Sequence, residues 1–150
     1  PFTFQSITTS TAQYPAVQFD GSDRFDQPAG ALGSDSRYAL FGFKGTFPAS
    51  LPGSTITLFG TTIGTGAILV QLLTTGQVRC NVSNAAGTII SQLNSTGATM
   101  FDGGVHEILI AIDVEQAAAA DGRFVFVDGV NRTSGSGTWT GGAGVRIGYS

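Results

Sequence analysis

Charged residues are scarce in this sequence of 150 residues: they make up only 11% of the chain, and the net charge is −3. Seven lysine and arginine residues scattered along the chain cannot form the clustered cationic surface that phosphate binding needs. We therefore expect no nucleic-acid partner, and an anionic membrane surface is disfavoured for the same reason. The surface must be formed mostly by hydroxyl groups, amides and the backbone.

Cysteine and long apolar runs are also nearly missing. Cys80 is the single cysteine, which excludes an internal disulfide framework. No stretch approaches the roughly 20 apolar residues that a membrane span requires, so we predict no membrane segment. Cys80 alternates with polar residues on the same face as Val78 and Val82. This pattern predicts a buried thiol on a strand and disfavours a reactive cysteine.

The residues that are abundant indicate a single all-β domain. Glycine, threonine and serine are frequent, whereas lysine, glutamate and methionine, which favour helices, are rare. The most regular segments are residues 106–115 and 122–130, both almost continuously apolar or alternating. Two such segments joined by a polar loop, the second closed by Asp128 and Gly129, are typical of adjacent strands in a β-sandwich.

Turn signals recur at intervals of about 8–12 residues, which is the spacing of strands in a sandwich. We expect strands over residues 16–19, 37–47, 54–61, 67–74, 77–81, 88–93, 106–115 and 122–130. Residues 117–120 are the one helix-like run and are interpreted as a helical turn inside a hairpin loop. Residues 1–13 are expected to form an N-terminal arm and residues 14–150 the domain.

The order of these segments resembles the concanavalin A-like, laminin-G-like jelly roll. The segments that carry this resemblance are residues 17–23 (Val-Gln-Phe-Asp-Gly-Ser-Asp), 38–47, 106–114, 123–130 with its Asp-Gly, and 145–148 with its Ile-Gly. The resemblance covers residues 14–148. It implies an all-β fold in which two antiparallel sheets form a jelly-roll sandwich.

One departure from that family concerns a sheet edge. Its members usually continue past the Ile-Gly into a last strand beside the first one, whereas this sequence ends at Ser150. An empty slot would expose unpaired backbone. Residues 1–13 could fold back into it, a neighbouring protomer could supply the strand, or the sequence could be a piece of a longer polypeptide. We expect the arm or a neighbour to cover this edge.

Catalytic residues are not evident. Sugar-cleaving relatives carry a Glu-x-Asp-x-x-Glu pattern, because retaining chemistry needs two carboxyl groups about 5–5.5 Å apart. Glu107 and Asp113 would lie about 20 Å apart on a strand. Asp113 and Glu115 would be roughly 7 Å apart, but they lie where the strand enters its loop. Alternation puts Glu107, Asp113 and Glu115 on one face, and we interpret it as a solvated outer face. His106, the single histidine, is interpreted as a hydrogen-bonding residue at a strand start. We expect no enzymatic activity.

Calcium is the one cofactor that the resemblance implies, since laminin-G-like domains often bind it through aspartates and carbonyl groups at a rim. The candidate ligands are Asp20, Asp23 and Asp26. The same spacing fits an ordinary turn stabilised by aspartate side chains.

A glycan would need an exposed aromatic ring beside polar groups. Trp139, the single tryptophan, lies in a loop of serine, glycine and threonine, and Asp128 and Asn131 are the polar candidates. Trp139 could equally fold back over the end of the sandwich or lie in a subunit contact.

Three classes of function follow from these observations. The first is a non-catalytic structural protein of a virus particle, such as a bacteriophage capsid decoration, fibre or tail component, on the virion surface and bound to itself or to other virion proteins. The second is an extracellular carbohydrate- or receptor-binding module, with a glycan as partner. The third, a glycoside hydrolase, is disfavoured by the missing carboxylate pattern.

Overall fold

The computed structural model describes residues 4–9, 12–17, 35–60, 68–97 and 100–148. The chain divides into two units, Pro1–Ala31 and Leu32–Ser150, and each is described by itself. In the first unit, β1 (Phe4–Thr9) and β2 (Ala12–Val17) form an antiparallel pair. A strand therefore lies inside the arm expected over residues 1–13, and the next strand begins earlier than residue 16.

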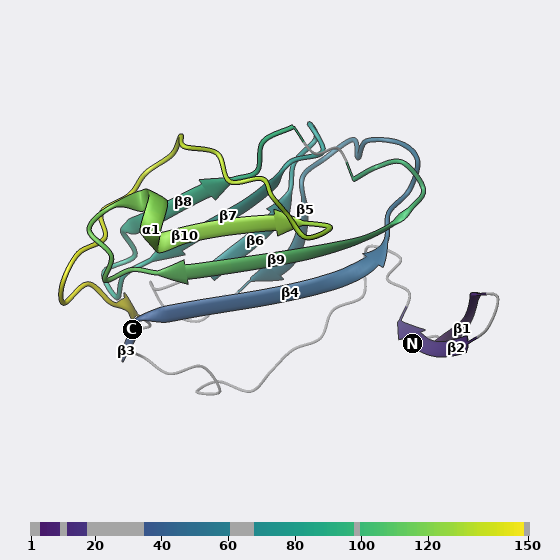
Figure 1. The fold of residues 1–150 in the computed structure, drawn as a ribbon, viewed down its shortest axis with the longest axis horizontal. Coiled ribbons are helices and arrows are strands. Elements are labelled where there is room, and N and C mark those ends of the chain that lie inside the picture. The colour runs from purple at the N-terminus through teal and green to yellow at the C-terminus, as the bar shows by residue number, and fades with distance from the viewer. Residues whose placement is uncertain (1–3, 10–11, 18–34, 61–67, 98–99, 149–150) are drawn as a thin grey trace. The chain divides into compact units, whose positions relative to one another are not determined.

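The second unit contains two four-stranded antiparallel sheets (Figure 1). One has the strand order β11-β10-β9-β4 and the other the order β5-β6-β7-β8, while β12 pairs with β3. The elements are β3 (Asp35–Ser36), β4 (Tyr38–Thr46), β5 (Ile56–Gly60), β6 (Ile68–Leu72), β7 (Val78–Ser83), β8 (Ile89–Asn94), β9 (Val105–Asp113), α1 (Ala119–Gly122), β10 (Arg123–Val127), β11 (Val130–Asn131) and β12 (Ile147–Gly148).

Strand β9 shows why the sheet forms as it does. Ile108, Ile110 and Ile112 are 0%, 1% and 2% exposed, because every second side chain of a strand points to the same face. Strand β10 runs antiparallel beside β9 and places Val125 and Val127 on that same buried face. The expected pair of adjacent long strands is confirmed.

One apolar core joins the two sheets. Its members come from β9 and β10 on one side and from β6, β7 and β8 on the other, together with residues of the connecting segments. They are Phe47, Val70, Leu72, Val78, Cys80, Val82, Ile90, Leu93, Met100, Phe101, Ile108, Ile110, Ile112, Val114, Val125, Val127 and Ile147. Cys80 is buried, so the expected buried thiol is confirmed. This burial raises the pKa of the thiol to about 12. The architecture is all-β and sandwich-like.

The segment expected as one strand over residues 122–130 is a hairpin. Asp128 and Gly129 have φ values of 51° and 74°, and they connect Val127 to Val130, which pair directly. Positive φ at both central residues is the geometry of a type I′ turn, for which Asp-Gly is a preferred sequence. The turn therefore divides the segment into β10 and β11.

Helical structure is confined to α1 within the described residues. Its four residues overlap the second half of the helix-like run expected over 117–120. In this part of the chain there is no helix with the length and apolar character needed to cross a membrane.

Candidate functional site

The face of the β11-β10-β9-β4 sheet that points away from the core carries large apolar side chains. Leu40, Ala111 and Phe124 form one row across β4, β9 and β10, and Leu109 and Phe126 pair in the next row. Leu40 is 75% exposed and Leu109 is 39% exposed. We call these five residues the apolar outer face. Exposed apolar patches occur at protein, membrane and ligand contact sites and on aggregation-prone surfaces.

Polar rows border the apolar outer face at both ends. Tyr38 pairs with Asp113 at one end, and Lys44 pairs with Glu107 at the other, with Nζ 3.8 Å from Oε2. An apolar centre with a polar rim is the usual composition of a protein–protein interface.

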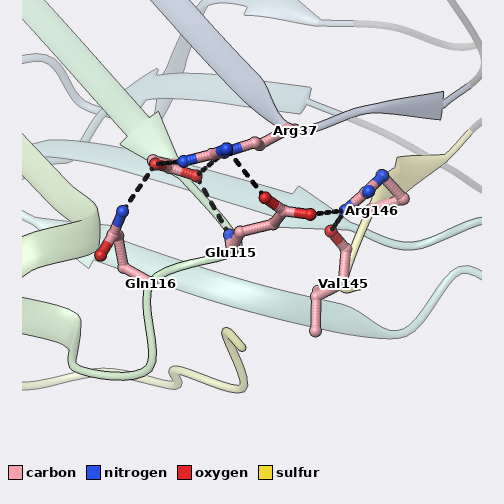
Figure 2. Close-up of polar contacts among 6 residues, drawn as sticks. Arg37, Glu115, Gln116, Val145 and Arg146 are labelled. Carbon is pink, nitrogen blue, oxygen red and sulfur yellow. Dashed lines mark hydrogen bonds and ion pairs between the residues drawn. The ribbon is translucent and has the colours of Figure 1, made fainter. Parts of the chain in front are cut away.

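Two carboxylates and two arginines meet beyond the Tyr38 end of this sheet. Arg37 donates from Nε and Nη2 to both oxygens of Asp113, each at 2.9 Å, and its Nη1 lies 2.9 Å from Glu115 Oε2. Arg146 donates to the other oxygen of Glu115, and Gln116 donates to Asp113. Figure 2 shows Arg37 reaching toward Glu115, with Arg146 on the far side of Glu115.

This arrangement holds both acids in ion pairs. The Arg37 guanidinium keeps the pKa of Asp113 well below its usual range. A general acid needs a raised pKa, so Asp113 lacks the electrostatics of an acid catalyst. The interpretation as a solvated face holds for Glu107, 62% exposed, but is wrong for Asp113 and Glu115, whose side chains are 17% and 21% exposed.

His106 lies between two other aspartates. Its Nε2 is 2.9 Å from Asp102 Oδ1 and its Nδ1 is 2.8 Å from Asp128 Oδ2. Asp128 also accepts a hydrogen bond from the backbone amide of Glu107. These bonds raise the pKa of His106 and lower the pKa values of both aspartates. The expected hydrogen-bonding role of His106 is confirmed.

The stability that His106 contributes should depend on pH. Its folded-state pKa lies above the ordinary value of about 6.5, so the contribution is complete below about pH 6.5 and is lost as pH rises through the folded-state pKa. The aspartate pKa values are lowered, so their contribution is present above about pH 4 and is lost at lower pH. Wild type should exceed His106→Gln in unfolding free energy most between about pH 4 and 6.5. Urea denaturation across pH measures this, and a difference that is unchanged in alkaline buffer would contradict it.

An open pocket of about 220 Å³ lies beside His106. It is lined by Gly97, Met100, His106, Val127, Asp128, Val130 and Arg132. The Nε of Arg132 is buried and has no hydrogen-bond partner among the described residues. Arg132 and Asp128 thus place one guanidinium and one carboxylate group at the wall of this pocket.

The three glycan candidates lie in two places. Asp128 and Asn131 belong to the β10–β11 hairpin, and Asn131 Oδ1 accepts a hydrogen bond from the Thr133 amide. Trp139 lies near the opposite end of β10, where it packs against the core. An added Cβ at Gly122 or Gly141 would lie 2.3 or 2.4 Å from its ring. Trp139 is therefore covered by close backbone, and the structure does not bring it to the other two residues.

Arg123 is a site that the sequence analysis missed. It is only 1% exposed, and its Nη1 donates to the carbonyls of Gln92 at 2.6 Å and Thr138 at 2.7 Å. Its Nη2 donates to the carbonyls of Ser136 and Gly137. Burial lowers its pKa. The available signal was its position in the alternating strand, on the same face as the buried valines of β10.

The calcium candidates Asp20, Asp23 and Asp26 lie outside the described residues. Across residues that are described, no group of three or more histidine, cysteine, aspartate or glutamate side chains is placed to hold a metal ion.

Comparisons with protein-family models, with curated proteins and with solved structures found no match. Function must therefore be argued from the geometry described above.

Proposed function

We propose that this domain is a non-catalytic structural protein of a virus particle, such as a bacteriophage capsid decoration, fibre or tail component. It acts by assembly and surface display. The observation that carries the proposal is the apolar outer face, which presents Leu40 and Leu109 to solvent on a regular sheet. The order of the strand segments along the sequence supports it, because that order resembles laminin-G-like jelly rolls, which occur in such proteins. We propose the same jelly-roll topology for the two sheets.

The chemistry of the acidic residues supports a role without catalysis. Asp113 and Glu115 are neutralised by Arg37 and Arg146, and His106 is held by two carboxylates. Asp113 lacks the raised carboxyl pKa, and His106 lacks the free imidazole nitrogen, that acid–base catalysis uses. The glycoside hydrolase alternative is disfavoured for this reason.

Light scattering on the eluting protein tests the proposal. Wild type should have a mass above the 15.4 kDa of one chain, rising with concentration. Phe124→Lys should lower that mass at equal concentration, because it places an ammonium group in a contact that must lose its water. Thr88→Lys, on an exposed turn between β7 and β8, is the matched control and should leave the mass unchanged.

The carbohydrate- or receptor-binding module is the second candidate function. The pocket beside His106 favours it, since the charged side chains of Arg132 and Asp128 line it next to apolar side chains. A protein that stays at 15.4 kDa and is retained on a glycan array would contradict assembly and favour this alternative.

A further inference from the structure

The free edges of the two sheets differ in how they are protected. The edge strand β5 of one sheet has a register shift between Thr57 and Phe59. The edge strand β11 of the other sheet is only two residues long. The edge of β8 is covered by a later segment, through hydrogen bonds such as Gln92 N to Thr138 O at 2.9 Å. Bulges, short strands, proline, charged side chains and covering segments are the usual means of protecting an edge.

Among the residues that the structure describes, strand β4 has no bulge and no covering segment, and Lys44 is its one charged side chain. It is nine residues long, contains no proline, and pairs with β9 without a register shift. Within the described part of the chain, β9 is its only strand partner. A long regular edge is a template for pairing with another strand.

The hydrogen bonds that flank β4 show which backbone groups point outward. The carbonyl of Arg37 accepts from Val114, and the amide of Phe47 donates to Gly104. Hydrogen-bonded pairs alternate along an antiparallel ladder, so odd-numbered residues of β4 bond to β9 and even-numbered residues point away from it. The outward residues are Tyr38, Leu40, Gly42, Lys44 and Thr46, whose side chains are also all exposed.

We propose that β4 of one molecule pairs antiparallel with β4 of a second copy across a twofold axis, which joins two sheets into one. This inference rests on the proposed assembly function and names its partner. Full overlap of the nine residues places Gly42 opposite Gly42, Leu40 opposite Lys44, and Tyr38 opposite Thr46. Outward-pointing residues then face one another along the whole edge, and the two apolar outer faces become continuous.

The charge on β4 favours this arrangement. Lys44 is the only charged side chain of the strand. A parallel arrangement in register would set Lys44 beside its own copy, whereas the antiparallel one separates the two by four residues, about 13 Å. The second copy therefore meets the edge without opposed like charges.

Gly42 allows a direct test of the twofold register. A Cβ at this position would meet only Leu109 Cδ1, at 4.0 Å, so the monomer accommodates a side chain there. In the Phe124→Lys background, which leaves β4 intact, we expect a dimer of twice the 15.4 kDa chain mass. Adding Gly42→Lys or Gly42→Glu should each raise the dimer Kd about tenfold or more, because like charges become directly opposed.

Mixing the lysine and glutamate variants should restore the dimer, since opposite charges then face each other across the axis. The matched pair Thr88→Lys and Thr88→Glu should show neither loss nor restoration. A dimer that Gly42→Lys leaves intact, a mixture that stays monomeric, or a monomer before any change at Gly42 would overturn the inference.

The outcomes also separate this inference from the proposed function. If Phe124→Lys lowers the mass while Gly42→Lys does not, the apolar outer face mediates assembly and the edge does not. If only the Gly42 variants lower the mass, the β4 edges pair with each other and the apolar outer face does not mediate assembly.

Hydrogen exchange gives a second measurement: the Leu40, Gly42 and Lys44 amides should exchange slowly in the dimer and fast in Gly42→Lys. Slow exchange in a monomer would overturn the inference, because another segment would then cover the edge.

Discussion

Ile110→Ala is expected to lower the free energy of unfolding by about 3–4 kcal/mol. Ile110 is 1% exposed and lies in β9, between β4 and β10, where its side chain belongs to the core that joins the two sheets. Truncation removes buried apolar area and leaves a cavity, because the regular sheet around Ile110 cannot collapse to fill it. Urea denaturation measures the loss as a lower midpoint with an unchanged slope.

Leu40→Ala is the matched control, because it removes an apolar side chain from the opposite face of the same sheet. Leu40 is 75% exposed, and its loss should change the unfolding free energy by less than about 1 kcal/mol. Equal losses in the two variants would mean that the two faces of the sheet are not distinguished by burial.

Arg123→Met should destabilise the protein by about 3 kcal/mol. The methionine fills the apolar part of the site, but the carbonyls of Gln92 and Thr138 lose their charged donor. Both carbonyls lie where a later segment covers the edge of β8, so the change should also loosen that segment. Urea denaturation gives the energy, and faster amide exchange over residues 134–140 reports the loosening.

Arg79→Met controls for the loss of a guanidinium as such. Arg79 lies on β7 with its side chain half-buried, and Nε donates to Asn94 Oδ1 at 3.2 Å. Its replacement should cost less than about 1 kcal/mol. If Arg123→Met were as stable as wild type, the four carbonyl contacts would not be what holds the covering segment.

Most strands could be predicted because period-two burial is a local property of the sequence. Isoleucines at alternate positions of residues 106–115 identify the buried face of β9, and Asp128 with Gly129 identifies the turn that follows β10. The core position of Cys80 follows from the same alternation.

Contacts between distant residues could not be predicted in this way. Arg37 and Asp113 are 76 positions apart, and only the pairing of β4 with β9 brings them together. The same holds for Arg123, whose partners are backbone carbonyls with no signature in the sequence. Asp128 was expected as a glycan ligand, but its contact with His106 joins residues 22 positions apart and depends on where the left-handed turn places Asp128.

Hydroxyl-radical labelling, read residue by residue with rising protein concentration, tests most directly whether the apolar outer face mediates assembly. Leu109 and Phe126 should lose labelling as the light-scattering mass rises, and they should keep it in Phe124→Lys. Ile108 and Ile110 should stay unlabelled throughout, since both are buried in a single chain. Labelling of Leu109 and Phe126 that is the same in the monomer and in the assembly would contradict the account.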